Sequence, residues 1–173
     1  MTTEFVLGGA RSGKSSYAES LAQASGKAIV YVATATGGDV EMAERIERHQ
    51  KDRPNSWRVI EEPLALAKVI TELSTKENCL LVDCLTLWLT NCLFNQDYAI
   101  DWQQQKGEFL AALKQAPGEI ILVSNEVGQG IVPMGEMSRR FVDESGWLHQ
   151  AIAKQVEKVT FVTAGIPQHL KGA

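Results

Sequence analysis

The segment Gly8–Ser15 (GGARSGKS) is the most informative part of this sequence, because it matches the phosphate-loop pattern G-x-x-x-x-G-K-[ST]. Gly8 and Gly13 allow backbone angles that other residues avoid, so successive N–H groups can point at phosphate oxygens. In such a loop Lys14 reaches the β- and γ-phosphates, and Ser15 can ligate Mg²⁺. We therefore expect a nucleoside triphosphate to be bound by Gly8, Gly9, Ala10, Arg11, Ser12, Gly13, Lys14 and Ser15.

Short apolar runs alternate with longer amphipathic stretches along the chain. Continuous apolar runs of this kind suit strands that are buried on both faces of a parallel sheet. We expect strands at Phe5–Leu7, Ala28–Val32, Trp57–Ile60, Leu80–Val82, Ile120–Val123 and Val159–Val162, and helices at Lys14–Ala24, Val40–Lys51, Leu64–Leu73, Leu85–Phe94, Trp102–Lys114 and Met137–Gln155. The alternation predicts an α/β fold of the P-loop NTPase type, with a mostly parallel sheet and helices on both faces.

The composition suits one domain, and we expect residues 1–173 to form a single nucleotide-binding and transferase domain. The net charge of -4 lacks the basic excess that is typical of nucleic-acid binding, so no nucleic-acid partner is expected. No window has the length and apolar character of a membrane span. Cys79, Cys84 and Cys92 form no CxxC pair, and the N-terminus lacks the pattern of a signal peptide. These features predict a cytoplasmic protein with inert thiols.

Two carboxylates follow expected strands. Asp83 ends the run Cys79–Val82, which is the Walker B pattern, and the carboxylate in that pattern serves the magnesium shell. Ser15 and Asp83 are therefore the expected Mg²⁺ ligands. Glu126 follows another apolar strand, and ligands bind at this carboxyl edge of a parallel sheet. The sequence does not decide between the roles of Asp83 and Glu126.

His49 lies in a local basic patch, residues 45–53, of an otherwise mildly acidic chain. Met42, Ile46 and His49 share one face of the expected helix. Two interpretations are open from the spacing alone. His49 is either a partly buried helix residue beside solvated charges, or a nucleophile that faces phosphates held by the neighbouring basic residues.

The other two histidines receive no role. His149 belongs to an amphipathic helical pattern beside Trp147 and Leu148, so we expect it to pack against the rest of the domain. His169 is expected to be solvated in a short polar tail.

Taken together, these segments resemble the bifunctional adenosylcobinamide kinase / adenosylcobinamide-phosphate guanylyltransferase family of cobalamin biosynthesis, over nearly the whole chain. The phosphate loop alone marks only a superfamily, whereas the His49 segment and NEVGQGIVP are more specific. The resemblance is carried by GGARSGKS, Tyr31–Thr34 (YVAT), Glu41–His49 (EMAERIERH), Arg53–Arg58 (RPNSWR), Asp83–Asn91 (DCLTLWLTN) and Ser124–Pro133 (SNEVGQGIVP).

The resemblance implies a RecA-like fold and two reactions. ATP or GTP phosphorylates the hydroxyl of the aminopropanol arm of adenosylcobinamide. GTP then guanylylates a histidine, which corresponds to His49, and the cobinamide phosphate takes the GMP to give adenosylcobinamide-GDP. The partners implied are therefore a corrinoid substrate, the nucleotides and Mg²⁺, and some members of the family form trimers, so a homo-oligomer is expected.

The resemblance also implies which residues contact the nucleotide. Besides the phosphate loop, these contacts fall on Thr34, Ala35, Thr36, Gln50, Lys51, Asp52, Arg53, Glu61 and Asp83. Whether Asp83 meets the metal, the guanine or the ribose stays open. His49 and Lys14 are the expected catalytic residues.

Two other functions remain possible from the sequence. The first is a plain small-molecule P-loop kinase, which would transfer only the γ-phosphate and never hold GMP on a histidine. The second is a nucleotide-dependent switch that acts through a protein partner. The preferred nucleotide for the kinase step, the corrinoid-binding residues and the retention of both activities are not readable from the sequence.

Overall fold

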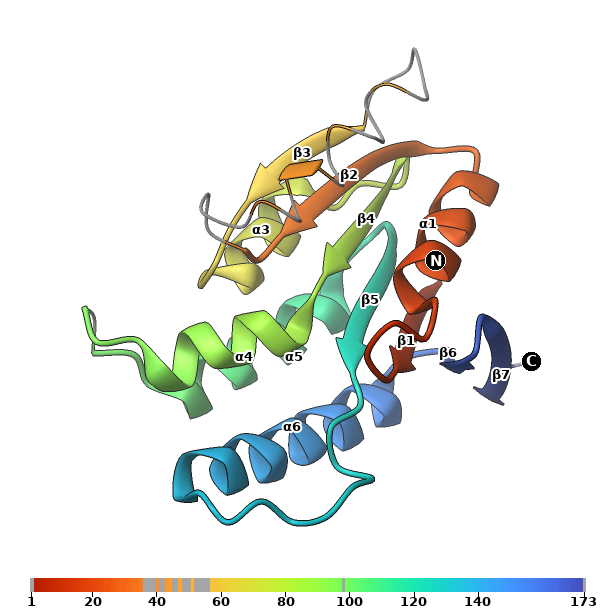
Figure 1. Cartoon of the computed structure of the whole chain (residues 1–173). Helices are drawn as coiled ribbons and strands as arrows, with labels where there is room; N and C mark the ends of the chain where they lie inside the picture. Colours follow the sequence, from red (N-terminus) through yellow and green to blue (C-terminus); the bar gives the residue numbers. More distant parts are fainter. Residues whose placement is uncertain are drawn as a thin grey trace.

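The polypeptide forms one seven-stranded sheet with helices packed on both of its faces (Figure 1). The computed structural model describes residues 2–35, 40, 43–44, 47, 51, 57–97 and 99–172. The strands are β1 (Thr3–Gly8), β2 (Ala28–Ala33), β3 (Arg58–Glu61), β4 (Asn78–Asp83), β5 (Glu119–Asn125), β6 (Lys158–Thr163) and β7 (Ile166–Lys171). The helices are α1 (Lys14–Ala24), α3 (Leu66–Leu73), α4 (Leu85–Phe94), α5 (Trp102–Gln115) and α6 (Glu136–Gln155).

The strand order is β3-β2-β4-β5-β1-β6-β7. Strands β1 to β6 pair in parallel, and β7 is antiparallel to β6. The predicted mostly parallel sheet is therefore confirmed. In this order β5 lies between β1, which leads into the phosphate loop, and β4, which ends at Asp83.

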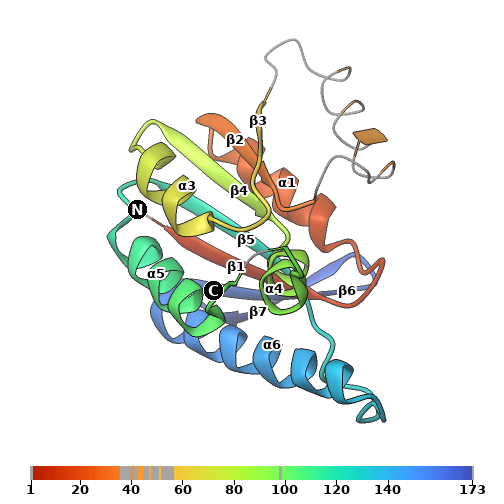
Figure 2. The same cartoon turned by 90° about the vertical axis from the view of Figure 1, so that its left-hand side faces the viewer.

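The two faces of the sheet carry separate apolar clusters, because neighbouring residues of a strand point to opposite faces. In β1, Val6 joins the cluster under α1, whereas Phe5 and Leu7 join the cluster under α3, α4, α5 and α6. Figure 2, turned by 90°, shows helices α3, α4, α5 and α6 together along one face of the sheet. Helices lie on both faces, as predicted, but one face carries most of them within the described part of the chain.

Tryptophans organise the more heavily covered face. Trp88 of α4 is fully buried and packs edge-on against Trp102 and at a tilt of 47° against Phe109, both of α5. The Trp88 indole donates a 2.8 Å hydrogen bond to the Leu64 carbonyl, and the Trp102 indole donates a 2.8 Å bond to Glu144 of α6. Buried indole N–H groups normally find such partners. These contacts hold α4, α5 and α6 together above the sheet.

Local signals explain several element boundaries. The Asp101 side chain accepts a bond from the Gln104 amide, which caps the start of α5 where the sequence placed it. Helix α3 begins at Leu66 rather than at the expected Leu64, whose carbonyl is used by Trp88. Of the helix expected over residues 40–51, Val40, Ala43, Glu44, Glu47 and Lys51 are helical, and the rest lies outside the described residues.

The expected polar tail near the end of the chain was wrong, because residues 166–171 form β7. A two-residue turn, Ala164-Gly165, joins it to β6, and both turn residues have positive φ (52° and 75°). This is the geometry that suits tight hairpins. His169 is exposed, as expected, but it lies in β7 and contacts Thr160 at 3.2 Å. Among the described residues, no helix has the combination of length and apolarity needed to cross a bilayer.

Candidate nucleotide-binding site

The segment between β1 and α1 has the geometry of a phosphate loop. Arg11 and Gly13 have positive φ angles of 53° and 91°. Such left-handed residues within a loop turn successive N–H groups to one side and form an anion-binding nest. At the φ angle of Gly13 a residue with a Cβ would be strained, so glycine is required there. At Gly8 space is the constraint, because a Cβ would overlap the Ser12 hydroxyl and lie 2.7 Å from the Val162 carbonyl oxygen.

The β6–β7 hairpin supports this loop from one side. The Gly165 amide donates a 2.7 Å hydrogen bond to the Ser12 carbonyl. A Cβ on Gly13 would lie 3.0 Å from the Gly165 Cα, so the two backbones are in close contact. The phosphate loop is therefore fixed by a turn that lies some 150 residues later in the sequence, an approximate separation that no local pattern can reveal.

Two side chains of the loop suit a phosphate ligand. The Lys14 ammonium donates to the Gly9 carbonyl at 3.1 Å, which holds it over the loop. The Ser12 hydroxyl is buried and has no hydrogen-bond partner among the described residues. Buried polar atoms normally have a partner, and a phosphate oxygen is one that such a loop can supply. The first turn of α1 contains no acidic residue, so its positive dipole end stays unopposed.

Asp83 lies at the carboxyl end of β4 on the same face of the sheet as α1. Strand alternation places it there, because Cys79 and Leu81 of β4 belong to the cluster under α1. Its Oδ2 accepts a 2.9 Å bond from the Tyr31 hydroxyl, and both side chains are buried. Ser15, in the first turn of α1, lies on this same face.

Electrostatics also connect the loop with the end of β4. Burial raises the pKa of the Cys84 thiol and the Asp83 carboxylate raises it further, whereas the positive charge of Lys14 lowers it. Lys14 is therefore near enough to Cys84 to act on its ionisation. The strand that leads into the phosphate loop and the Walker B strand both end at this edge of the sheet, on either side of β5.

Thr34 connects β2 to β4 rather than facing outward. Its hydroxyl donates to the Cys84 carbonyl at 2.7 Å and accepts from the Cys84 amide at 3.0 Å. Its own carbonyl accepts from the Asn91 side chain at 3.0 Å. The fully buried Thr34 thus fixes the strand ends around Asp83, and Ala35 next to it is also buried. Contact of either residue with a nucleotide stays a prediction.

The remaining expected contacts are placed as follows. Glu61 is exposed at the carboxyl end of β3, paired in register with Ala33 of β2, so it belongs to the same sheet edge. Lys51 is exposed and pairs with Glu47 at 2.6 Å, which lowers the pKa of that glutamate through the hydrogen bond. Outside the described residues lie Thr36, His49, Gln50, Asp52 and Arg53.

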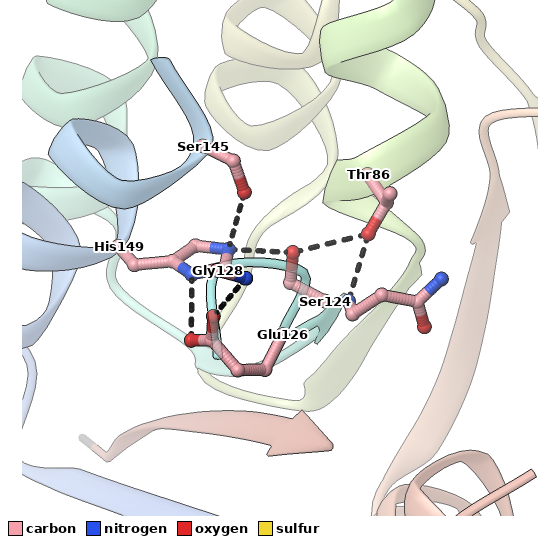
Figure 3. A network of polar contacts seen from close by, with 7 residues as sticks. Thr86, Ser124, Glu126, Gly128, Ser145 and His149 are labelled. Carbon is pink, nitrogen blue, oxygen red and sulfur yellow. Dashed lines mark hydrogen bonds and ion pairs between the residues drawn. The ribbon is translucent and has the colours of Figure 1, made fainter. Parts of the chain in front are cut away.

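A second polar cluster lies at the same edge on the opposite face of the sheet (Figure 3). Ser124 of β5 contacts Thr86 of α4 at 3.2 Å and His149 of α6 at 2.9 Å. The other ring nitrogen of His149 lies 3.8 Å from Glu126. His149 is buried and packs edge-on against Phe5, as expected, but its hydrogen bonds were not predicted. Burial lowers the pKa of His149 below its usual 6.5, although Glu126 acts in the opposite direction.

A preformed cage for a metal ion is not present among the described residues, in which no three His, Cys, Asp or Glu side chains gather suitably. This is compatible with Mg²⁺, which is commonly held by one or two protein oxygens together with substrate phosphates and water. The Ser15 hydroxyl and the Asp83 carboxylate, on one face of the sheet beside the phosphate loop, are a donor set of that kind.

Comparison with known proteins identifies the family to which this sequence is similar. Residues 4–170 match the family described as cobinamide kinase / cobinamide phosphate guanyltransferase. The chain is 56% identical to the bifunctional adenosylcobalamin biosynthesis protein CobP of Pseudomonas aeruginosa, over 98% of this chain and 97% of that protein. It is 38% identical to the bifunctional adenosylcobalamin biosynthesis protein CobU of Escherichia coli, over 96% of this chain and 98% of that protein.

Solved structures show the fold. The flagellar accessory protein FlaH of Methanocaldococcus jannaschii superimposes with a TM-score of 0.57 at 13% identity, covering 98% of this chain and 78% of FlaH. The RadB recombinase superimposes with a TM-score of 0.50 at 13% identity, covering 92% of this chain and 73% of RadB. These likenesses and the strand order confirm the RecA-like P-loop NTPase fold. From the match over residues 4–170 and the two full-length relatives, this chain belongs to the cobinamide kinase / cobinamide phosphate guanyltransferase family.

Proposed function

We propose that this protein phosphorylates adenosylcobinamide with ATP or GTP and then transfers GMP from GTP, through a guanylylated His49, to give adenosylcobinamide-GDP. Both activities are those of the family, and the relatives at 56% and 38% identity are named as bifunctional proteins of adenosylcobalamin biosynthesis. The observation that carries the proposal is the phosphate loop, with Lys14 held over it and Asp83 beside it at one sheet edge.

The kinase step follows from the loop. The hydroxyl oxygen of the substrate attacks the γ-phosphorus, and the bond between that phosphorus and the β–γ bridging oxygen breaks. Backbone N–H groups of residues 8–15 and the Lys14 ammonium spread the charge that develops on the phosphate oxygens. Ser15 and Asp83 would hold Mg²⁺, which when bound would neutralise further charge on the β- and γ-phosphates.

The guanylyl step needs a nucleophile. A neutral imidazole nitrogen of His49 attacks the α-phosphorus of GTP and pyrophosphate leaves. A phosphate oxygen of the cobinamide phosphate then displaces the histidine, so the GMP is transferred in two displacements. Support for His49 comes from its place in the basic segment over residues 45–53 and from the family match across it. Thr36, Gln50, Lys51, Asp52, Arg53 and Glu61 complete the proposed nucleotide contacts.

The test uses GTP labelled at either the α- or the γ-phosphate. Wild-type protein with Mg²⁺ should take up α-label and no γ-label, and the adduct should be acid-labile and alkali-stable, as a phosphorus–nitrogen bond is. His49→Ala should take up none while keeping much of the phosphorylation of adenosylcobinamide. His169→Ala is the matched control, because this histidine is exposed on β7. Label on the His49→Ala protein, or none on the wild type, would leave a plain P-loop kinase as the better interpretation.

Assembly and location remain proposals as well. A homo-oligomer, with the trimer as the form that the resemblance favours, is tested by light scattering on the purified protein. The cytoplasm suits both the nucleotide substrates and the free thiols of Cys79, Cys84 and Cys92.

A further inference from the structure

Four side chains form a continuous polar chain that the proposed reactions do not use (Figure 3). Thr86 contacts Ser124 at 3.2 Å, Ser124 contacts His149 Nε2 at 2.9 Å, and His149 Nδ1 lies 3.8 Å from Glu126 Oε2. These residues come from α4, β5, α6 and the segment after β5. The chain therefore links three elements at the carboxyl edge of the sheet.

The hydrogen bonds along these side chains can all run in one direction. The Asn125 amide donates to Thr86 Oγ1 at 2.7 Å, and an amide can only donate. The Thr86 hydroxyl can then donate to Ser124, and Ser124 can donate to His149 Nε2. In that arrangement Nε2 is an acceptor, and the single ring proton of a neutral imidazole stands on Nδ1, facing the Glu126 carboxylate.

The opposite arrangement is unfavourable. If His149 Nε2 donated to Ser124, a neutral ring would turn the lone pair of Nδ1 toward a carboxylate. A doubly protonated ring would avoid this, but burial lowers the pKa of His149, and its side chain is only 9% exposed. The neutral ring with its proton on Nδ1 is therefore the favoured form, since Ser124 at 2.9 Å and Ser145 at 3.5 Å can then both donate to Nε2.

Glu126 is the one acidic member of this chain, and like Thr86 it is partly exposed to solvent. Its side chain is 23% exposed, whereas Ser124 and His149 are buried. Its backbone amide donates to the Gly8 carbonyl at 3.0 Å, which fixes it at the start of the phosphate loop. One carboxylate oxygen accepts from the Gly128 amide at 2.7 Å, and the other faces His149. The carboxylate is thus oriented on two sides.

We propose that Glu126 accepts the proton of the attacking hydroxyl in the phosphoryl transfer, and that His149 acts as its positioning residue. This rests on the proposed kinase function. The substrate O–H bond breaks, its proton passes to the Glu126 carboxylate, and the oxygen forms a bond to the γ-phosphorus. The bond from that phosphorus to the bridging oxygen breaks, and the nucleoside diphosphate leaves with the electron pair. A carboxylate in this role is typical of enzymes that phosphorylate hydroxyls.

The placement of the two carboxylates fits a division of labour. Asp83 lies on the face of the sheet under α1, with Ser15. Ile120 and Leu122 of β5 belong to the cluster on the other face, and alternation puts Ser124 there with them, next to His149 of α6. One acidic group thus lies on each face of the sheet at the edge that carries the phosphate loop, so one can serve the metal and the other can serve the acceptor.

The competing role for these four side chains is purely structural, namely to attach α6 and α4 to the sheet.

The first experiment separates the catalytic role from the structural role with Glu126→Gln, which keeps the shape of the side chain and removes the base. The kcat for phosphorylation of adenosylcobinamide should fall about 100-fold or more, the usual range for losing a general base. Uptake of α-label from GTP and the melting temperature should stay near the wild type. Glu77→Gln is the matched control, because Glu77 is exposed just before β4, at the opposite edge of the sheet.

The second experiment tests His149 with two amides. In His149→Asn the amide nitrogen can occupy the place of Nδ1 and still direct an N–H toward Glu126, whereas in His149→Gln it reaches the place of Nε2. Kinase kcat should be largely preserved in His149→Asn and reduced at least tenfold in His149→Gln. A purely structural pin predicts that both variants lose stability and that both activities fall together.

The outcomes are distinguishable. If wild-type protein does not phosphorylate adenosylcobinamide, the proposed function itself fails. If it does, and Glu126→Gln keeps the wild-type kcat, only the role of Glu126 is overturned. If His149→Gln keeps kcat, or if His149→Asn loses as much as His149→Gln, the role of His149 is overturned. Should Glu126→Gln lose α-label uptake and melt early, the chain is structural and the proposal is wrong.

Discussion

The Tyr31 hydroxyl donates a 2.9 Å hydrogen bond to Asp83 Oδ2 across the β2–β4 pair, and both side chains are buried. The Tyr31 ring also stacks on Trp57, with centroids 6.1 Å apart. The phenol therefore holds the carboxylate that would serve Mg²⁺ while its ring fills the space under α1. These two tasks can be separated by substitution.

Tyr31→Phe keeps the ring and removes the donor. A hydrogen bond to a charged group contributes about 1.5–3 kcal/mol, so the free energy of unfolding should fall by about that amount. The Mg²⁺ concentration for half-maximal kinase activity should rise. Urea denaturation and a magnesium titration measure the two effects. Tyr17→Phe is the control, because its hydroxyl lies 3.4 Å from Glu4 in a more open place and should matter less. Equal losses in both variants would contradict the special role of Tyr31.

Lys14→Ala should weaken both activities, because its ammonium is held over the loop that receives the β- and γ-phosphates. Losing one preorganised charge contact to a transition state commonly lowers the rate about 100-fold or more. Steady-state kinetics with ATP and α-label uptake with GTP measure the losses. Lys27→Ala, which breaks a 3.4 Å pair with Glu119 at the other edge of the sheet, should leave both unchanged. Normal turnover in a folded Lys14→Ala protein would refute the assignment of the loop.

The stability of the fold should depend on His149 below neutral pH. Because burial lowers the folded pKa of His149, the unfolded chain binds the proton first as the pH falls below about 6.5. The free energy of unfolding from this residue is therefore intact above 6.5, and it decreases from 6.5 down to the lowered folded pKa. Urea denaturation at several pH values measures the slope. The slope should be smaller in His149→Asn, and an identical slope in both proteins would contradict this prediction.

The three thiols should be unreactive in the native protein. Burial raises the pKa of Cys79 to about 11 and that of Cys92 to about 12, and it also raises the pKa of Cys84. Since the thiolate is the reactive form, a disulfide reagent at pH 8 should modify them slowly unless the protein is unfolded. Three equivalents should react at once in denaturant. Rapid reaction of the native protein at any of the three thiols would contradict their raised pKa values.

The parts that could be predicted are those that depend on local sequence. Residues 8–15 carry their own conformational requirements, and the apolar runs identify the strands of a parallel sheet. The polar chain through Ser124 and His149 could not be predicted, because it joins residues 25 positions apart through the packing of α6 on β5. A weak signal did exist. Ser145, His149 and Ile152 share one buried helix face, and a polar pair on such a face implies partners.

The strand β7 was missed for a different reason. Its sequence, IPQHLK, is polar and contains a proline, which excludes most central strands but is tolerated at the edge of a sheet. The dipeptide Ala164-Gly165 does not predict a tight turn, because alanine rarely takes positive φ. The hairpin forms through its pairing with β6, which a pattern read along the chain does not contain.

The close contact of this hairpin with the phosphate loop has a consequence for synthesis on the ribosome. The loop is translated early, yet the neighbours of β1 begin only at Glu119 and Lys158, and Gly165 is needed to hold Ser12. An emerging chain therefore carries β1 with both edges unpaired through most of translation, a state that invites pairing with other chains. A fragment that stops before residue 158 would have the complete phosphate-loop motif without a folded loop. Nucleotide could then bind and stabilise only chains whose synthesis is nearly finished, because the folded loop requires the strands that are made last.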